Sequence, residues 1–261
     1  MLANLFDYRQ IVIAALIFMP LERLLPARPA QHVYRRHFWN DIVYLLGNGI
    51  VIRLGFVLLI ALLMTLIGPV AADGVVSRWP FWLQVLAAVA VADAGFYAAH
   101  RAFHAVPFLW RFHSVHHSIE ELDWLAAHRV HPVDQIVHSA ASYLPLYLLG
   151  FPVEAIAAHG AIYLVQSHLI HANTRLGFGP LRHVLASPAF HHWHHTNEAP
   201  FDRNFAPSFT WLDRLFGTLH LPDAVPARYG TDDPVPHDYL RQLAWPFVRR
   251  AAPTAVAPEP A

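Results

Sequence analysis

The chain has 261 residues, of which 56% are hydrophobic and only 14% are charged, and its mean hydropathy is positive. Soluble domains are roughly one-quarter charged, so this composition predicts an integral membrane protein. The formal net charge is zero, which argues against a nucleic-acid partner. The chain has no cysteine, which excludes disulfides, thiolate metal sites and Fe–S clusters held by its own residues.

Five apolar segments follow one another along the chain and predict helices at a membrane: 8–25, 40–68, 81–104, 133–149 and 152–170. A helix needs about 20 apolar residues to cross the hydrocarbon layer. The first segment is interrupted by Pro20 and Glu22, which favours a position partly in the interface. The last two flank a turn at 150–152 and predict a hairpin that either spans the membrane or re-enters it.

The arginines predict one orientation for these segments. They are concentrated before the second segment and after the third and fifth, whereas the loop between the second and third holds only Arg78. Positively charged loops face the cytoplasm, so we expect the histidine-rich loops on the cytoplasmic face of the inner membrane. We expect a single domain over 1–250, with its histidine-rich region at 93–219, and a disordered Ala- and Pro-rich tail at 251–261.

Histidine is the residue that bears most directly on function, because many of the 20 histidines share one spacing. They concentrate in the sequences HRAFH (100–104), HSVHH (113–117) and HHWHH (191–195). Side chains three or four residues apart lie on one face of a helix, so each sequence presents two or three imidazoles together. Neutral imidazole is a common ligand of Zn, Cu, Fe and Ni, and this pattern therefore predicts metal binding.

The number of candidate ligands favours two metal ions. Eight histidines share the spacing: His100, His104, His113, His116, His117, His191, His194 and His195. A structural zinc site takes four protein ligands and a catalytic one takes three, so eight exceed the need of a single ion. Two ions held between helices explain the count, and several separate zinc sites are the alternative. We expect His192 to pack or hydrogen-bond instead.

Two further histidines and one carboxylate are candidates for the same site. His171 follows the fifth apolar segment and His131 precedes Pro132, and both can reach the face that carries the other histidines. Asp93 precedes His100 by seven residues on one helical stripe, and a carboxylate in an apolar helix usually marks function. We predict that Asp93 accepts the free N–H of a ligating imidazole. The alternative is a structural Asp93 neutralised by Arg53.

The three histidine motifs resemble those of the fatty acid hydroxylase/sterol desaturase superfamily, whose members are membrane di-iron oxygenases with HxxxH, HxxHH and a later HxxHH. The sequence RVHP (129–132) and the stretch from HAN (171–173) to Ser187-Pro188 also resemble it. The resemblance covers about 93–219, with a looser match around 22–23 and 40–41. It implies an all-α integral membrane bundle with a cytosolic histidine-rich cap. It also implies that the eight histidines, with His131 and His171, hold two non-haem irons, which zinc can replace.

The activity that the resemblance implies is oxidation of an unactivated C–H bond of a lipid, sterol-like or fatty acyl, by O₂. Hydroxylation and desaturation both begin with the same hydrogen abstraction. No G-x-G-x-x-G motif occurs, so electrons are expected from a cytochrome b5-like or ferredoxin-type protein that docks on the arginine-rich face.

Two other functions use the same residue types. A histidine-rich metal transporter or storage protein would place its ligands near the middle of several spans, whereas these gather at one end of them. A zinc-dependent membrane hydrolase would need three ligands and a glutamate base, as in H-E-x-x-H. The three histidine motifs contain no glutamate.

Overall fold

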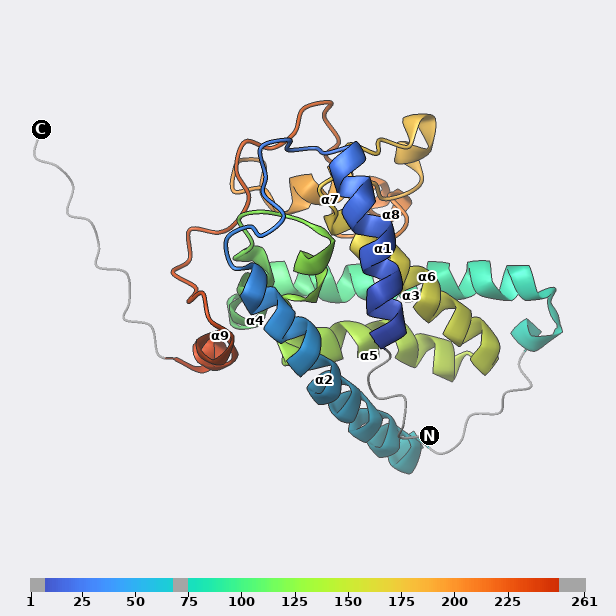
Figure 1. The fold of residues 1–261 in the computed structure, drawn as a ribbon. Coiled ribbons are helices and arrows are strands. Elements are labelled where there is room, and N and C mark those ends of the chain that lie inside the picture. Colours follow the sequence, from blue (N-terminus) through green and yellow to red (C-terminus); the bar gives the residue numbers. More distant parts are fainter. Residues whose placement is uncertain (1–7, 68–74, 249–261) are drawn as a thin grey trace, which may run out of the picture.

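The computed structural model describes residues 8–67 and 75–248, which form an all-helical protein (Figure 1). The predicted tail at 251–261 lies outside these residues. The longer helices are α1 (Tyr8–Leu24), α2 (Phe38–Ile67), α3 (Phe81–Ala105), α4 (Pro107–His117), α5 (Pro132–Leu148) and α6 (Val153–His171). The shorter ones are α7 (Pro188–His194), α8 (Trp211–Leu215), α9 (Tyr239–Ala244) and the 3-10 turns η2 (Val75–Arg78), η3 (Trp124–His128), η4 (Gly179–His183) and η5 (Trp245–Phe247). Extended pairing in the described part is limited to two isolated bridges.

The five helices predicted from the apolar segments are all present, with ends that differ by one or two residues. Proline sets several of the starts, because its fixed φ suits the first turn and its missing N–H is not needed there. Pro107, Pro132 and Pro188 each begin a helix that carries or supports histidines. The side chain of Ser187 caps α7 by accepting from the backbone N–H of Phe190.

The all-α prediction is confirmed for the described residues. Within the described residues, α3 alone is long and apolar enough to cross a membrane, by length and composition. The multi-span bundle and the cytosolic cap stay predictions.

Helix α3 is central to the molecule and packs along α5 (Figure 1). Gly95 permits this contact, since a Cβ at that position would lie 2.0 Å from the carbonyl oxygen of Ala141 on α5. Helix α6 contacts α3 as well. The histidine-bearing end of α3 thus has α4 after it in sequence and α5 and α6 beside it.

A buried network of charges ties the start of α2 to the segment after α4. Arg35 binds the carboxylates of Asp41 and Asp123, and Arg129 also binds Asp41. All four side chains are buried, so each charge depends on its partners for the solvation that water would otherwise supply. The network fixes the backbone of Arg129, whose carbonyl contacts a histidine of the site described next.

Candidate metal centre

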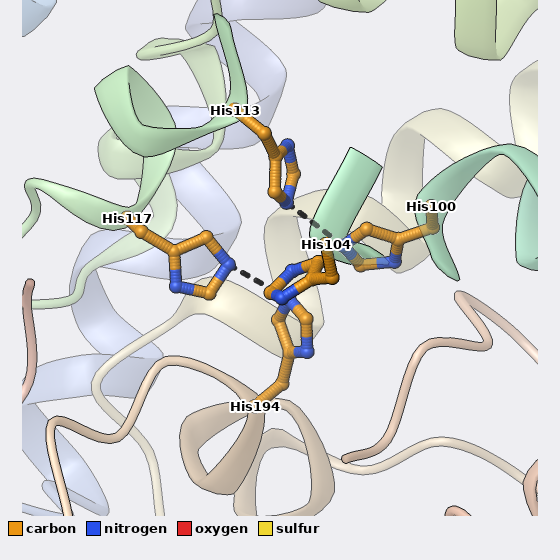
Figure 2. A group of neighbouring side chains, drawn as sticks. All are labelled: His100, His104, His113, His117 and His194. Carbon is orange, nitrogen blue, oxygen red and sulfur yellow. Dashed lines mark hydrogen bonds between the residues drawn. The ribbon is translucent and has the colours of Figure 1, made fainter. Parts of the chain in front are cut away.

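Nine of the predicted ligands gather into two groups where the ends of α3, α4, α6 and α7 meet. The first group takes histidines from α3, α4 and α7, and its rings point toward one another (Figure 2). Its members are His100, His104, His113, His117 and His194. One ring nitrogen from each lies within 4.8 Å of those of the others. Residues 94 positions apart in the sequence therefore share one centre.

The second group takes histidines from α4, α6 and α7 and is equally compact. Its members are His116, His171, His191 and His195, whose ligand atoms also lie within 4.8 Å of one another. The two groups are neighbours, because α4 gives His116 to one and the adjacent His117 to the other. The rings of His117 and His195 stack across the boundary, with centroids 4.7 Å apart.

Hydrogen bonds at Nδ1 orient the rings of the first group. The Nδ1–H of His100 donates to the carbonyl of Phe205 at 2.7 Å, and that of His194 donates to the carbonyl of Arg203 at 2.8 Å. His104 donates to Asp202 at 2.9 Å. A neutral imidazole carries one proton, so a ring that donates from Nδ1 has a lone pair at Nε2. These acceptors therefore leave Nε2 free to bind a metal.

Asp134 is a candidate functional residue that the sequence patterns do not identify. It is 1% exposed, and its Oδ2 accepts from Nδ1 of His113 at 2.7 Å. Its Oδ1 lies 2.6 Å from Nδ1 of His138, which also donates to the Asp134 backbone carbonyl at 3.0 Å. A carboxylate on the outer nitrogen of a ligating histidine fixes the ring and increases its basicity. The available signal was an aspartate two residues after Pro132, in the first turn of an apolar helix.

In the second group, the two histidines from α4 and α6 have Nδ1 acceptors and the two from the α7 region do not. His116 and His171 donate from Nδ1 to the carbonyls of Arg129 and Ser167. The Nδ1 atoms of His191 and His195 are buried and have no hydrogen-bond partner among the described residues. The second group therefore has fewer acceptors behind its rings than the first.

The contacts between rings fit a bound cation. Nε2 of His100 lies 3.0 Å from Nε2 of His113, and Nε2 of His171 lies 3.1 Å from Nε2 of His116. All four rings donate from Nδ1, so in the neutral state these pairs bring lone pairs face to face. A metal ion between the rings converts this repulsion into shared ligation. The donor set, imidazole only, suits Fe, Zn, Cu or Ni.

Burial keeps these imidazoles in the uncharged form that metals bind. Loss of hydration lowers the pKa of His113 to about 3 and that of His116 to about 4. The same cause puts the pKa of His191, His194 and His195 well below the ordinary value for histidine. At neutral pH the site therefore needs no deprotonation before it binds metal.

The structure separates His131 from the predicted ligands, whereas His192 behaves as expected. His131 joins neither group: it caps α5, where its Nδ1 accepts from Val133 N–H and its Nε2 donates to the carbonyl of Leu243. His192 behaves as predicted and bonds Ala172 and Tyr229.

Asp93 binds backbone amides and not, as predicted, the N–H of a histidine ring. Its carboxylate accepts from the backbone N–H groups of Ser208 and Phe209, at 3.0 and 2.9 Å, in place of an imidazole. It thereby holds the loop whose Phe205 carbonyl orients His100. The reason is the fold: the chain after α7 returns across α3 and brings unpaired amides to the carboxylate. The side chain of Arg53, the alternative partner, lies outside the described residues.

The structure is that of an all-helical protein with two histidine groups that could each hold a metal ion. Comparison with known sequences identifies the family. The profile of the fatty acid hydroxylase family matches residues 85–218, which is about half of the chain and includes all nine histidines of the two groups. The chain belongs to this family.

Its relatives include enzymes of lipid metabolism. The chain is 33% identical over 186 residues to an ornithine lipid hydroxylase of Rhizobium tropici, covering 70% of this chain and 56% of that protein. It is 35% identical to an alkylglycerol monooxygenase of Danio rerio (61% and 34% covered) and 29% identical to methylsterol monooxygenase 1 of Rattus norvegicus (54% and 48% covered). The aligned region thus covers between about a third and just over half of the length of each of these relatives. No solved structure matches the chain.

Proposed function

We propose that the protein is a membrane-bound monooxygenase that uses two non-haem irons, O₂ and external electrons to hydroxylate a C–H bond of a lipid. The observation that carries the proposal is the pair of adjacent all-histidine groups, one with five members and one with four. A single ion cannot use nine imidazoles, and two ions side by side can. The relatives named as lipid hydroxylases and monooxygenases favour hydroxylation over desaturation.

Bound iron would supply the O₂ activation that side chains alone cannot provide. The balanced reaction takes the lipid C–H bond, O₂, two electrons and two protons to the lipid alcohol and water. The protein orients the histidines through their Nδ1 acceptors and surrounds them with apolar walls. Phe96, Ile170 and Phe205 line the cavity beside the two groups and keep bulk water away from the reacting carbon.

Exposed apolar surface supports a membrane location. Along α2, large apolar side chains such as Val51, Leu54, Val57, Leu58 and Leu62 are each about half exposed or more. A continuous apolar helix surface of this kind is typical of contact with lipid. A substrate that resides in the bilayer could then reach the cavity between α3, α5 and α6 from the side. The electron donor would be a cytochrome b5-like or ferredoxin-type protein on the arginine-rich face.

Separate variants of the two groups test the metal assignment. His194→Ala removes a ligand from the five-histidine group and His116→Ala removes one from the four-histidine group. Each should reduce bound iron from two per chain to about one and abolish O₂-dependent product formation, while the protein still inserts in the membrane. Iron content by elemental analysis and lipid products by mass spectrometry are the measurements.

His183→Ala is the matched control, because His183 is exposed and belongs to neither group. It should keep both irons and full activity. Retained product formation in both ligand variants would contradict the proposal. Zinc as the sole metal, with no iron-dependent activity after iron loading, would favour the hydrolase alternative.

The absence of native cysteine makes the orientation simple to test. His183→Cys lies in the segment after α6, on the predicted cytoplasmic face, and Arg78→Cys lies before α3, on the opposite face. Both positions are exposed. A membrane-impermeant thiol reagent added outside intact cells should label the residue at 78 and leave the residue at 183 unlabelled. The reverse pattern would contradict the predicted orientation.

A further inference from the structure

Two small cavities lie between α3, α5 and α6, next to the histidine groups. The first, of about 40 Å³, is lined by members of both groups, including His100, His113 and His171. The second, of about 10 Å³, extends from it toward the α5–α6 turn. They share four lining residues: Phe96, Gln135, His138 and Tyr163. A water molecule needs roughly 10–15 Å³ of such space, so the first cavity has room for a group larger than a single water.

The walls of these cavities carry two buried imidazole nitrogens that lack a partner. His138, which lines both cavities, is 3% exposed, and His159, which lines the second, is 4% exposed. Neither Nε2 of His138 nor Nδ1 of His159 has a hydrogen-bond partner among the described residues. A buried polar atom without a partner is costly, and an unpaired pair in one cavity indicates an occupant that supplies the missing bonds.

The bonding of His138 fixes which kind of partner it needs. Its Nδ1 lies 2.6 Å from Asp134 Oδ1 and donates to the Asp134 backbone carbonyl at 3.0 Å; both oxygens only accept, so Nδ1 carries a proton. When the ring is neutral, the proton on Nδ1 leaves Nε2 as the acceptor. Its partner must bring an O–H or N–H group, and an ether or ester oxygen would not satisfy it. Asp134 holds the ring in place through the same carboxylate that binds His113.

We propose that this cavity binds a hydroxyl group carried on the lipid chain of the substrate, with His138 Nε2 as its hydrogen-bond acceptor. This inference rests on the proposed function and narrows its substrate class to chains that already carry a hydroxyl. The cavity wall contains metal-group histidines, so the carbon to be oxidised and the hydroxyl lie close together on one molecule. His138 belongs to neither histidine group, so its proposed role is to select the substrate by accepting a hydrogen bond from its hydroxyl.

Binding of three matched probes tests the inference without turnover. The zinc-loaded protein in lipid nanodiscs is titrated with 1-dodecanol, 1-methoxydodecane and dodecane. The ether keeps the oxygen but has no hydrogen to donate. We expect the alcohol to bind about 3- to 10-fold more tightly than the ether, the range that one net hydrogen bond supplies, and the ether to bind no better than the alkane.

Variants then assign the effect to one side chain. His138→Leu should remove the preference for the alcohol and leave the affinity for the alkane unchanged. His138→Gln should restore part of it, because the amide oxygen can accept. His220→Leu, at a histidine that lines neither cavity, should leave all three affinities unchanged. The comparison of probes on the unaltered protein needs no variant, so a folding defect in one variant does not block the test.

Equal affinity for the alcohol and the ether on the unaltered protein would overturn the inference, and is the result expected if water alone fills the cavity. A preference that survives His138→Leu would also overturn it, because the acceptor would then lie elsewhere. Neither result bears on iron content or lipid oxidation. The proposed function fails on those measurements, and this inference fails on binding.

Discussion

At the residue scale, the histidine groups depend on acceptors that the histidine motifs do not contain. The carbonyls of Phe205, Arg203 and Arg129 and the carboxylate of Asp134 each receive an Nδ1–H and so decide which nitrogen faces the centre. A ligand ring that is free to rotate must lose that freedom when metal binds, which weakens binding. Asp134 should matter most among these acceptors, because it is charged, fully buried and bonded to two rings.

Asp134→Asn should reduce metal affinity about 10- to 100-fold, because the amide is a weaker acceptor for His113 and can bond only one ring through oxygen. The measurement is retention of metal against a graded chelator. Asp202→Asn is the matched control: Asp202 bonds His104, but its side chain is 66% exposed, so water can replace it and the loss should be smaller. Equal affinity in Asp134→Asn and the unaltered protein would contradict this account.

At the scale of elements, the approach of α3 to α5 places two of the five histidines in the first group. His100 and His104 lie on the same helix as Gly95, one to three turns beyond the point where the α3 backbone meets Ala141. Any side chain at 95 would separate the two helices. The cost of overpacking a contact of this kind is about 1–3 kcal/mol or more.

Gly95→Ala should therefore lower the free energy of unfolding by at least about 1–3 kcal/mol and weaken metal binding as α3 shifts. Thermal unfolding and metal content are the measurements. Gly177→Ala is the control, since its added Cβ would come no nearer than 3.9 Å to another atom. A Gly95→Ala protein as stable as the control would show that α3 and α5 can separate without cost.

At the scale of the whole molecule, the structure combines an apolar outer surface with a core rich in polar and titratable groups. Many of these buried groups are bonded to one another: Arg35 and Arg129 bind Asp41, and six of the nine histidines in the two groups donate from Nδ1 to a carbonyl or carboxylate. Burial of so many neutral imidazoles makes the fold sensitive to acid.

The metal-free protein should lose stability as the pH falls below about 6.5. Desolvation lowers the pKa of His128 and His113 to about 3, and of His116 and His192 to about 4. The unfolded chain takes up these protons at its ordinary pKa and the folded chain does not. Between pH 6.5 and about 4, acid therefore favours unfolding by up to about 1.4 kcal/mol per pH unit for each histidine.

Denaturant midpoints of the metal-free protein at pH 7, 6 and 5 measure this dependence. Added metal should raise the midpoint at pH 7, because ions bind the neutral rings of the folded state, and the increase should persist at pH 5, where the folded rings are still neutral. A midpoint that does not change between pH 7 and 5 would mean that these histidines are not held neutral by the fold.

The helices and nine of the candidate ligands follow from local sequence patterns alone. Apolar runs predicted five helices to within one or two residues at each end, because helix length and apolar composition are local properties. The spacing of HRAFH, HSVHH and HHWHH predicted imidazoles on shared helical faces for the same reason. His171, at the end of α6, also lies in one of the two groups, and its role as a ligand stays a prediction.

Tertiary structure alone decided how the histidines divide and what orients them. The separation of His116 from its neighbour His117 into different groups depends on where α6 and α7 meet α4, which no local pattern encodes. The carboxylate that contacts a histidine of the first group belongs to Asp134 and not to Asp93, and His131 caps α5. Hydrogen-bond partners depend on which groups the folded chain brings within reach. The spacing of residues along the sequence determines which side chains share one face of a helix. Only the packing of the helices determines which of these faces come together in one site.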